Sequence, residues 1–238
     1  KKKESRKFSH FDATLSYHKI KEGVHLLHKL NPKVETFSFH TYLKGGLTEE
    51  TKKTNGSYNF ISSLINASTH NDTKFNIRSF FEKHGTSYST FSGKNAYGST
   101  LNGIANDFGA VFPQYMDCLT NSKFSKQELN HEKTIAIRML KAEKEDPTRS
   151  CFKTVSSSIF SDHSYGLSPI GDLSSIKNIT SLNLQKTHKK NLRNSPIVFC
   201  YSGPDSSEKV LHVIERNISN IMPRKDSRKI PIKKITQK

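Results

Sequence analysis

The sequence contains no tryptophan, few cysteines and no long apolar stretch. Cys118, Cys151 and Cys200 are odd in number and far apart, so we expect neither a disulfide framework nor a cysteine-based metal site. Only 33% of the residues are hydrophobic, and no apolar run is long enough to span a membrane. We therefore expect a soluble protein, in a compartment left open among bacterial cytoplasm, periplasm and an organelle lumen.

Acidic residues are also scarce, with 21 Asp and Glu against 38 Lys and Arg, which gives a formal net charge of +17. Such an excess raises the hypothesis of a nucleic-acid binder. The charge is spread along the chain, with local runs at residues 1–3, 186–190 and 224–234, and no DNA- or RNA-binding motif accompanies it. A solvated basic surface is the favoured interpretation, and we expect no specific nucleic-acid partner.

Several catalytic patterns are missing as well. The sequence has no Gly-x-Ser-x-Gly elbow and no glycine-rich phosphate loop, and no cue links Cys151 or Cys200 to a catalytic histidine. His25 and His28 stand three apart on an expected strand, so their side chains point to opposite faces. We expect no metal site there.

Apolar residues alternate with a period of two over residues 34–43, where Phe37, Phe39, Thr41 and Leu43 are expected to face a core. Residues 87–91 and 96–101 predict two strands of a hairpin around Gly93-Lys94. The short apolar run 196–201 is typical of a buried central strand.

Helical signals lie between and after these strands. An amphipathic run ends at Gly85, residues 108–119 are apolar at helical spacing, and Ser125 with Glu128 forms a capping box before a long helix. Asp146-Pro147 opens a further helix. The pattern predicts an α+β fold.

We expect a single domain over residues 15–222. Residues 1–14 are assigned to a basic N-terminal extension, and residues 223–238 to a basic, proline-punctuated tail or linker.

Residues 56–69 carry the most specific signal. Their Gly56, Phe60, aliphatic positions and Thr69 follow the segment Gly-x-x-His-Phe-Leu-Glu-His-Met-x-x-x-Gly-Thr. This stretch resembles the active-site helix of the insulinase/pitrilysin metallopeptidases, the inverzincins. The resemblance continues in the family's order from the strand that ends at Gly45-Gly46 to the strand before Gly203. It includes residues 20–27, which resemble the opening hairpin of that family, and residues 163–171, which resemble its His-Pro-Tyr-Gly loop and imply a structural role for His163. The fold implied is a mostly antiparallel sheet covered by helices on one face, as in a mitochondrial processing peptidase-like domain.

In active members of that family two histidines hold zinc and the glutamate between them acts as a base. Here Asn59, Ser62 and Ser63 occupy those positions. An amide oxygen and neutral hydroxyls are poor zinc ligands, and Ser62 cannot act as a base near neutral pH without a partner. Glu132 matches the third ligand of the family, and without the histidines we expect it to be a solvated helix residue. The resemblance therefore implies no catalytic residue and no metal in this domain, with zinc only in a partner.

The resemblance also implies a binding role for the strand predicted at residues 87–91, which in this family is a sheet edge that pairs with extended substrate. The corresponding residues are Ser87, Tyr88, Ser89 and Thr90. The alternative is an ordinary hairpin strand.

The function implied is that of a non-catalytic domain or subunit, which completes a protease chamber and holds extended peptide. Its partner would be a second half-domain or a catalytic subunit of the same family. The alternative is a structural scaffold of the same fold without peptide binding. Whether the chain is a first or a second half stays open, since second halves lack the zinc motif even in active enzymes.

Overall fold

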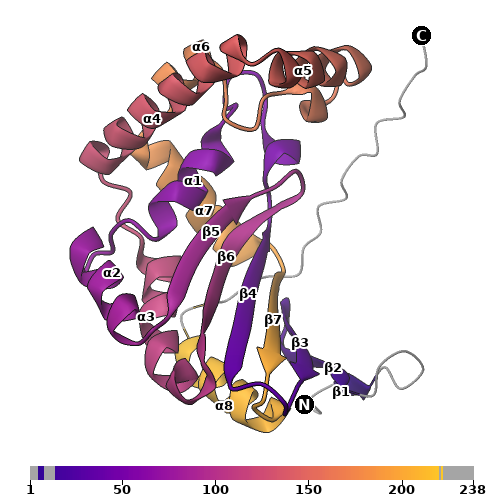
Figure 1. Cartoon of the computed structure of the whole chain (residues 1–238), viewed down its shortest axis with the longest axis vertical. Helices are drawn as coiled ribbons and strands as arrows, with labels where there is room; N and C mark the ends of the chain where they lie inside the picture. Colours follow the sequence, from indigo (N-terminus) through magenta and orange to yellow (C-terminus); the bar gives the residue numbers. More distant parts are fainter. Residues whose placement is uncertain (1–4, 8–13, 220, 222–238) are drawn as a thin grey trace.

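The computed structural model describes residues 5–7, 14–219 and 221. In this part of the chain a seven-stranded sheet has the order β1-β2-β3-β7-β4-β6-β5 (Figure 1). The strands are β1 (Ser5–Lys7), β2 (Leu15–Lys21), β3 (Val24–Leu30), β4 (Thr36–Lys44), β5 (Ser87–Ser92), β6 (Ala96–Ile104) and β7 (Ile197–Gly203). Neighbouring strands are antiparallel except β3 and β7, which run parallel.

Helices gather on one face of this sheet (Figure 1). They are α1 (Ser57–Ile65), α2 (Lys74–Lys83), α3 (Phe108–Asn121), α4 (Lys126–Glu145), α5 (Pro147–Ile159), α6 (Leu173–Asn178), α7 (Ser181–Asn194) and α8 (Ser207–Asn217). Short 3-10 turns are η1 (Leu47–Glu49), η2 (Ala105–Asp107) and η3 (Ser164–Gly166). The predicted α+β class, with a mostly antiparallel sheet covered on one face, is confirmed.

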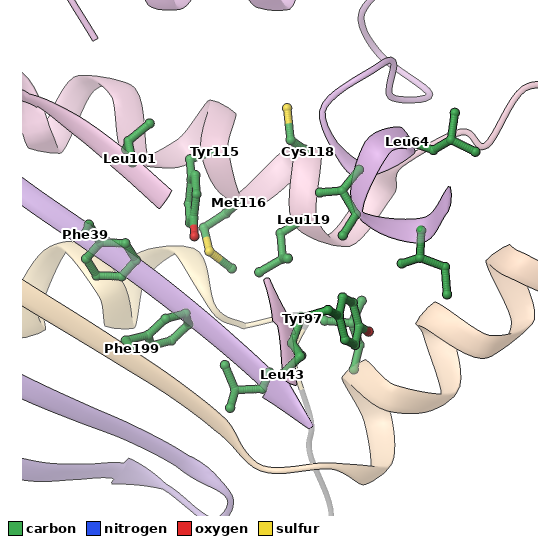
Figure 2. Close-up of a cluster of buried hydrophobic side chains, with 14 of the residues drawn as sticks. Phe39, Leu43, Leu64, Tyr97, Leu101, Tyr115, Met116, Cys118, Leu119 and Phe199 are labelled. Carbon is green, nitrogen blue, oxygen red and sulfur yellow. The ribbon is translucent and has the colours of Figure 1, made fainter. Parts of the chain in front are cut away.

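The core lies between the sheet and the helices. On β4, Phe37, Phe39, Thr41 and Leu43 are buried, while Tyr42 on the opposite face is 38% exposed, as the period of two predicts. Figure 2 shows Phe39 and Phe199 of the sheet, whose ring centroids lie 5.5 Å apart, beneath Tyr115 and other residues of α3. Burying one such aromatic side chain contributes roughly 1.5–3 kcal/mol to folding.

The short strand β1 lies inside the segment 1–14 that the sequence assigns to an extension. It pairs with β2 and so adds a strand to the sheet. The basic tail expected at residues 223–238 lies outside the described residues.

The expected capping box at the start of α4 is only half formed. The Ser125 hydroxyl accepts a hydrogen bond from the backbone N–H of Glu128 at 3.2 Å, as expected. The Glu128 carboxylate, however, accepts from the hydroxyls of Ser125 and Ser68, each at 2.7 Å. The glutamate thus ties α4 to the segment that follows α1, a tertiary contact that spacing along the chain could not reveal.

Candidate functional site

The N-terminus of α1 is held by a buried carboxylate. Oε2 of Glu50 accepts from the backbone N–H of Gly56 at 2.8 Å, and Oε1 accepts from that of Tyr58 at 2.8 Å. The side-chain amide of Asn55 donates to the same carboxylate at 3.0 Å. Burial raises the pKa of Glu50, and these hydrogen bonds oppose the shift. Glu50 has no signature in the sequence, because a side chain that lies six residues before Gly56 falls outside the local pattern of a helix cap.

Gly56 is required at this point by its backbone and its surroundings. Its φ of 90° lies in the left-handed region, and a Cβ atom would meet the carbonyl oxygen of Ile170 at 2.6 Å. The loop 163–171 therefore packs directly against the start of α1. In addition, Asn55 donates from its side chain to the carbonyl of Ser168 at 2.8 Å.

The same loop also holds the tip of the β5–β6 hairpin. Tyr165 donates its hydroxyl to the side-chain oxygen of Asn95 at 2.9 Å. Nδ1 of His163 accepts from the backbone N–H of Tyr165 at 3.1 Å, which caps η3. His163 thus has a structural role, as the resemblance implies.

The degenerate motif lies on α1, which keeps its packing residues. Phe60, Ile61, Leu64 and Ile65 are buried. Ser62 is 5% exposed and donates its hydroxyl to the backbone carbonyl of Asn59 at 2.8 Å, within its own helix. Asn59 and Ser63 are half-buried.

Glu132 lies on α4, which packs beside α1. It is half-buried and lines a cavity of about 810 Å³ between α4 and residues 68–76, together with His131 and Glu128. Met139, one heptad further along α4, is 49% exposed.

These residues do not fit a zinc ion. The oxygen donors of Asn59, Ser62 and Ser63 are an amide and two alcohols, and the Ser62 hydroxyl already donates to its own helix. Within residues 5–7, 14–219 and 221, no three His, Cys, Asp or Glu side chains are grouped so as to hold a metal. No hydrolytic step can be written through this chain's own motif.

Among the described strands, β5 forms the end of the sheet and pairs with β6 alone. Tyr88 anchors it, because its ring lies 5.0 Å from that of Phe81 and 5.3 Å from that of Tyr115. Burial of the Tyr88 hydroxyl raises its pKa far above the ordinary value. Ser87 and Ser89 lie on the opposite face and are exposed.

The hairpin fixes which backbone groups of β5 are used by the sheet. The N–H of Gly93 donates to the carbonyl of Ala96 at 2.8 Å, so the backbone of Gly93 faces β6. Backbone groups of successive residues in an antiparallel pair face alternate sides of the strand. The residues that face β6 with Gly93 are Phe91, Ser89 and Ser87. The residues whose N–H and C=O groups face outward are Tyr88, Thr90 and Ser92.

Two further hydrogen bonds agree with this assignment of inward and outward residues. The N–H of Thr86, two residues before Tyr88, donates away from β6 to the carbonyl of Phe81 at 2.9 Å. On β6, the carbonyl of Asn95 accepts from Gly45 beside β4 at 3.2 Å, so Ala96 must face β5. Of the four predicted substrate-binding residues, Tyr88 and Thr90 therefore offer outward backbone groups, and Ser87 and Ser89 do not.

Ser92 is the outward residue that the sequence analysis missed. A period of two along β5 places it in phase with Tyr88 and Thr90, but the hairpin closure at Gly93 had to be known first. The outer edge of β5, defined by Tyr88, Thr90 and Ser92, belongs to a strand on which α1 packs, and α1 also packs on β6. Tyr58 of α1 contacts Tyr97 of β6 with ring centroids 5.1 Å apart.

Residues 26–172, more than half of the chain, match the model of the insulinase family, peptidase family M16. The chain belongs to this peptidase family. It is 20% identical over 204 residues to the probable mitochondrial-processing peptidase subunit beta of Schizosaccharomyces pombe, covering 86% of this chain and 45% of that protein. It is 18% identical over 192 residues to an uncharacterized zinc protease of Streptomyces coelicolor, covering 81% of this chain and 42% of that protein.

Solved structures show the same M16 fold. A protease from Helicobacter pylori superposes with a TM-score of 0.81 at 15% identity, covering 98% of this chain and 54% of the other. An M16 inactive domain from Pseudomonas fluorescens superposes with a TM-score of 0.79 at 15% identity, covering 94% and 51%. The chain thus spans about half the length of these relatives.

The described residues include no helix with both the length and the apolar character that a membrane crossing requires.

Proposed function

We propose that this chain is a non-catalytic M16 half-domain that holds extended peptide along the outer edge of β5. It completes a protease chamber together with a second half-domain or a catalytic subunit of the family. Zinc would be supplied by that partner, because the donor atoms at Asn59, Ser62 and Ser63 do not suit the metal.

The outer edge of β5 is the observation that carries the binding role. Tyr88, Thr90 and Ser92 turn their N–H and C=O groups away from β6, and β5 has no further strand beside it in the described sheet. Such an edge can pair with an extended peptide by adding a strand, and the hydrogen bonds involve only the peptide backbone. The ring of Tyr88 packs into the core and keeps the strand in place.

Two observations support a partner of the same family. The chain spans 45% of the Schizosaccharomyces pombe relative and 54% of the Helicobacter pylori chain, so those proteins carry a second segment of similar length. The helix-free face of the sheet also carries apolar side chains that are only partly buried. They are Leu27, Tyr42, Phe91, Val198 and Cys200. A second half-domain would cover surface of this kind.

The test replaces one outward N–H on β5. Thr90→Pro removes a backbone donor from the outer edge, whereas proline at Ser89 would break a hydrogen bond to β6. Binding of an unstructured, fluorescein-labelled peptide of about 15 residues would be measured by fluorescence anisotropy. We expect Thr90→Pro to weaken binding at least fivefold.

The matched control is Thr90→Val, which keeps the backbone donor and the shape of the side chain and should bind as the unmodified chain does. A peptide that is N-methylated at consecutive residues should also bind more weakly, since it lacks backbone donors on both edges. Equal affinity of Thr90→Pro and the unmodified chain would reject the edge and leave the scaffold alternative.

A further inference from the structure

Helix α5 presents its apolar side to solvent. No residue of α5 is buried, and three of its apolar side chains are largely exposed, Phe152 at 69%, Val155 at 46% and Ile159 at 59%. These residues stand three and four apart, so they form one stripe along the helix. We call them the apolar stripe of α5.

The polar side of α5 makes the contacts with the rest of the domain. The Ser150 hydroxyl donates to the backbone carbonyl of Glu143 at 3.1 Å, and Lys153 lies 3.2 Å from the Glu143 carboxylate. Asp146 caps the helix by accepting from the N–H groups of Thr148 and Arg149. An isolated helix of this length is marginal in water, and amphipathic helices are stabilised by packing their apolar side. The orientation of α5 therefore points to an external surface that covers the stripe.

The surroundings of α5 are basic and partly apolar. Figure 1 shows α5 at the periphery beside α4 and α6. A cavity of about 370 Å³ between these helices is lined by Leu140, Leu173, Lys141, Lys144, Lys153 and Asp172. A partner that fits here has apolar side chains flanked by Asp or Glu.

We infer that the apolar stripe of α5 is a docking surface for the second M16 half, which would present an apolar, acid-flanked segment to it. This rests on the proposed function, and the missing half is the occupant because the chain spans about half of its relatives. The stripe faces away from α4, and the binding it provides is independent of the peptide held by β5.

The experiment measures how tightly this chain associates with M16 proteins of its source organism that retain the His-x-x-Glu-His motif. Each of these proteins is co-expressed with this chain, and the complex is purified. The double variant Phe152→Ser/Ile159→Ser should raise the Kd at least tenfold by analytical ultracentrifugation, because apolar anchors dominate such interfaces. The control is Phe75→Ser, since Phe75 on α2 is 78% exposed and lies away from α5. It should change the Kd less than twofold, and neither variant should change the melting temperature of the isolated chain.

Charge reversal gives a second readout. Lys141→Glu/Lys144→Glu should weaken the same association, and the difference from the unmodified chain should shrink as salt is raised.

The inference is overturned if the stripe variant and the Phe75 control bind the partner equally, or if no such member binds the unmodified chain. It is also overturned if the stripe instead drives binding to phosphatidylcholine vesicles with phosphatidylserine, or dimerisation of this chain. The peptide-binding function is tested separately, by comparing peptide affinity of the isolated chain with and without Thr90→Pro.

Discussion

Nδ1 of His188 lies 3.0 Å from the hydroxyl of Tyr97, inside the core between α7 and β6. Nε2 of the same ring lies 2.7 Å from the backbone carbonyl of Leu119. Because a carbonyl can only accept, Nε2 carries the proton, and Nδ1 accepts from Tyr97. His188 is thus a neutral histidine with both ring nitrogens hydrogen-bonded, and burial lowers its pKa to about 4.

This pairing makes stability depend on pH. The pKa of His188 is about 4 in the folded chain against 6.5 for an ordinary histidine, so the folded state binds fewer protons between these values. Stability should therefore fall as pH drops from 6.5 towards 4, by about 3 kcal/mol for this group. Urea unfolding at pH 7 and pH 4.5 measures the change.

His188→Gln is the matched variant for that measurement. A glutamine amide can donate to Leu119 and accept from Tyr97 without titrating. The variant should lose clearly less stability than the unmodified chain between pH 7 and pH 4.5. Glu50, whose raised pKa favours the folded state at low pH, acts in the opposite direction in both proteins. An identical loss in the two proteins would exclude His188 as the source.

The buried cap of α1 should contribute strongly to stability. Glu50→Ala leaves the N–H groups of Gly56 and Tyr58 without their acceptor, which we expect to lower the free energy of unfolding by about 2–3 kcal/mol. Glu82→Ala is the comparison, because Glu82 pairs with Arg78 on an exposed helix surface and should change it by less than about 1 kcal/mol. Similar losses in both variants would contradict the capping role.

Two glycines separate backbone strain from steric contact. Gly85→Ala places a Cβ in open space at a φ of 55°, and we expect a loss of about 1 kcal/mol. Gly56→Ala adds a contact of 2.6 Å with the carbonyl of Ile170, so its loss should exceed that of Gly85→Ala by about 1–3 kcal/mol. Thermal unfolding of both variants tests the order, and the reverse order would show that loop 163–171 yields easily.

Zinc should not bind this chain tightly. Asn59, Ser62 and Ser63 offer no ligand that the metal prefers, and Glu132 alone supplies one carboxylate. Titration with zinc in a calorimeter should show no micromolar site. A micromolar site that disappears in Glu132→Gln would mean that the third-ligand position still works.

Much of the fold could be predicted from the sequence, because the alternation on β4 and the turn at Gly93 between two strands are local signals. The altered motif on α1 could also be read position by position. Other features depend on residues that meet only in three dimensions. Glu50 caps a helix from outside it, and His188 finds Tyr97 across the core.

The outer edge of β5 also combines a local signal with a feature that only the three-dimensional structure shows. The strand itself is visible as alternating residues, and the resemblance indicated its role. Which backbone groups face outward depends on the closure of the hairpin at Gly93. The candidate donors are therefore Tyr88, Thr90 and Ser92, and not all four residues 87–90.

The spacing of the outward groups on β5 has a consequence for selectivity. A ligand held through main-chain atoms at every second residue can move along β5 by two positions and restore the same bonds. Such main-chain binding does not depend on side-chain identity and requires only an unfolded, extended chain. Any preference for particular sequences would have to come from surfaces that side chains reach, such as the cavity beside Glu132.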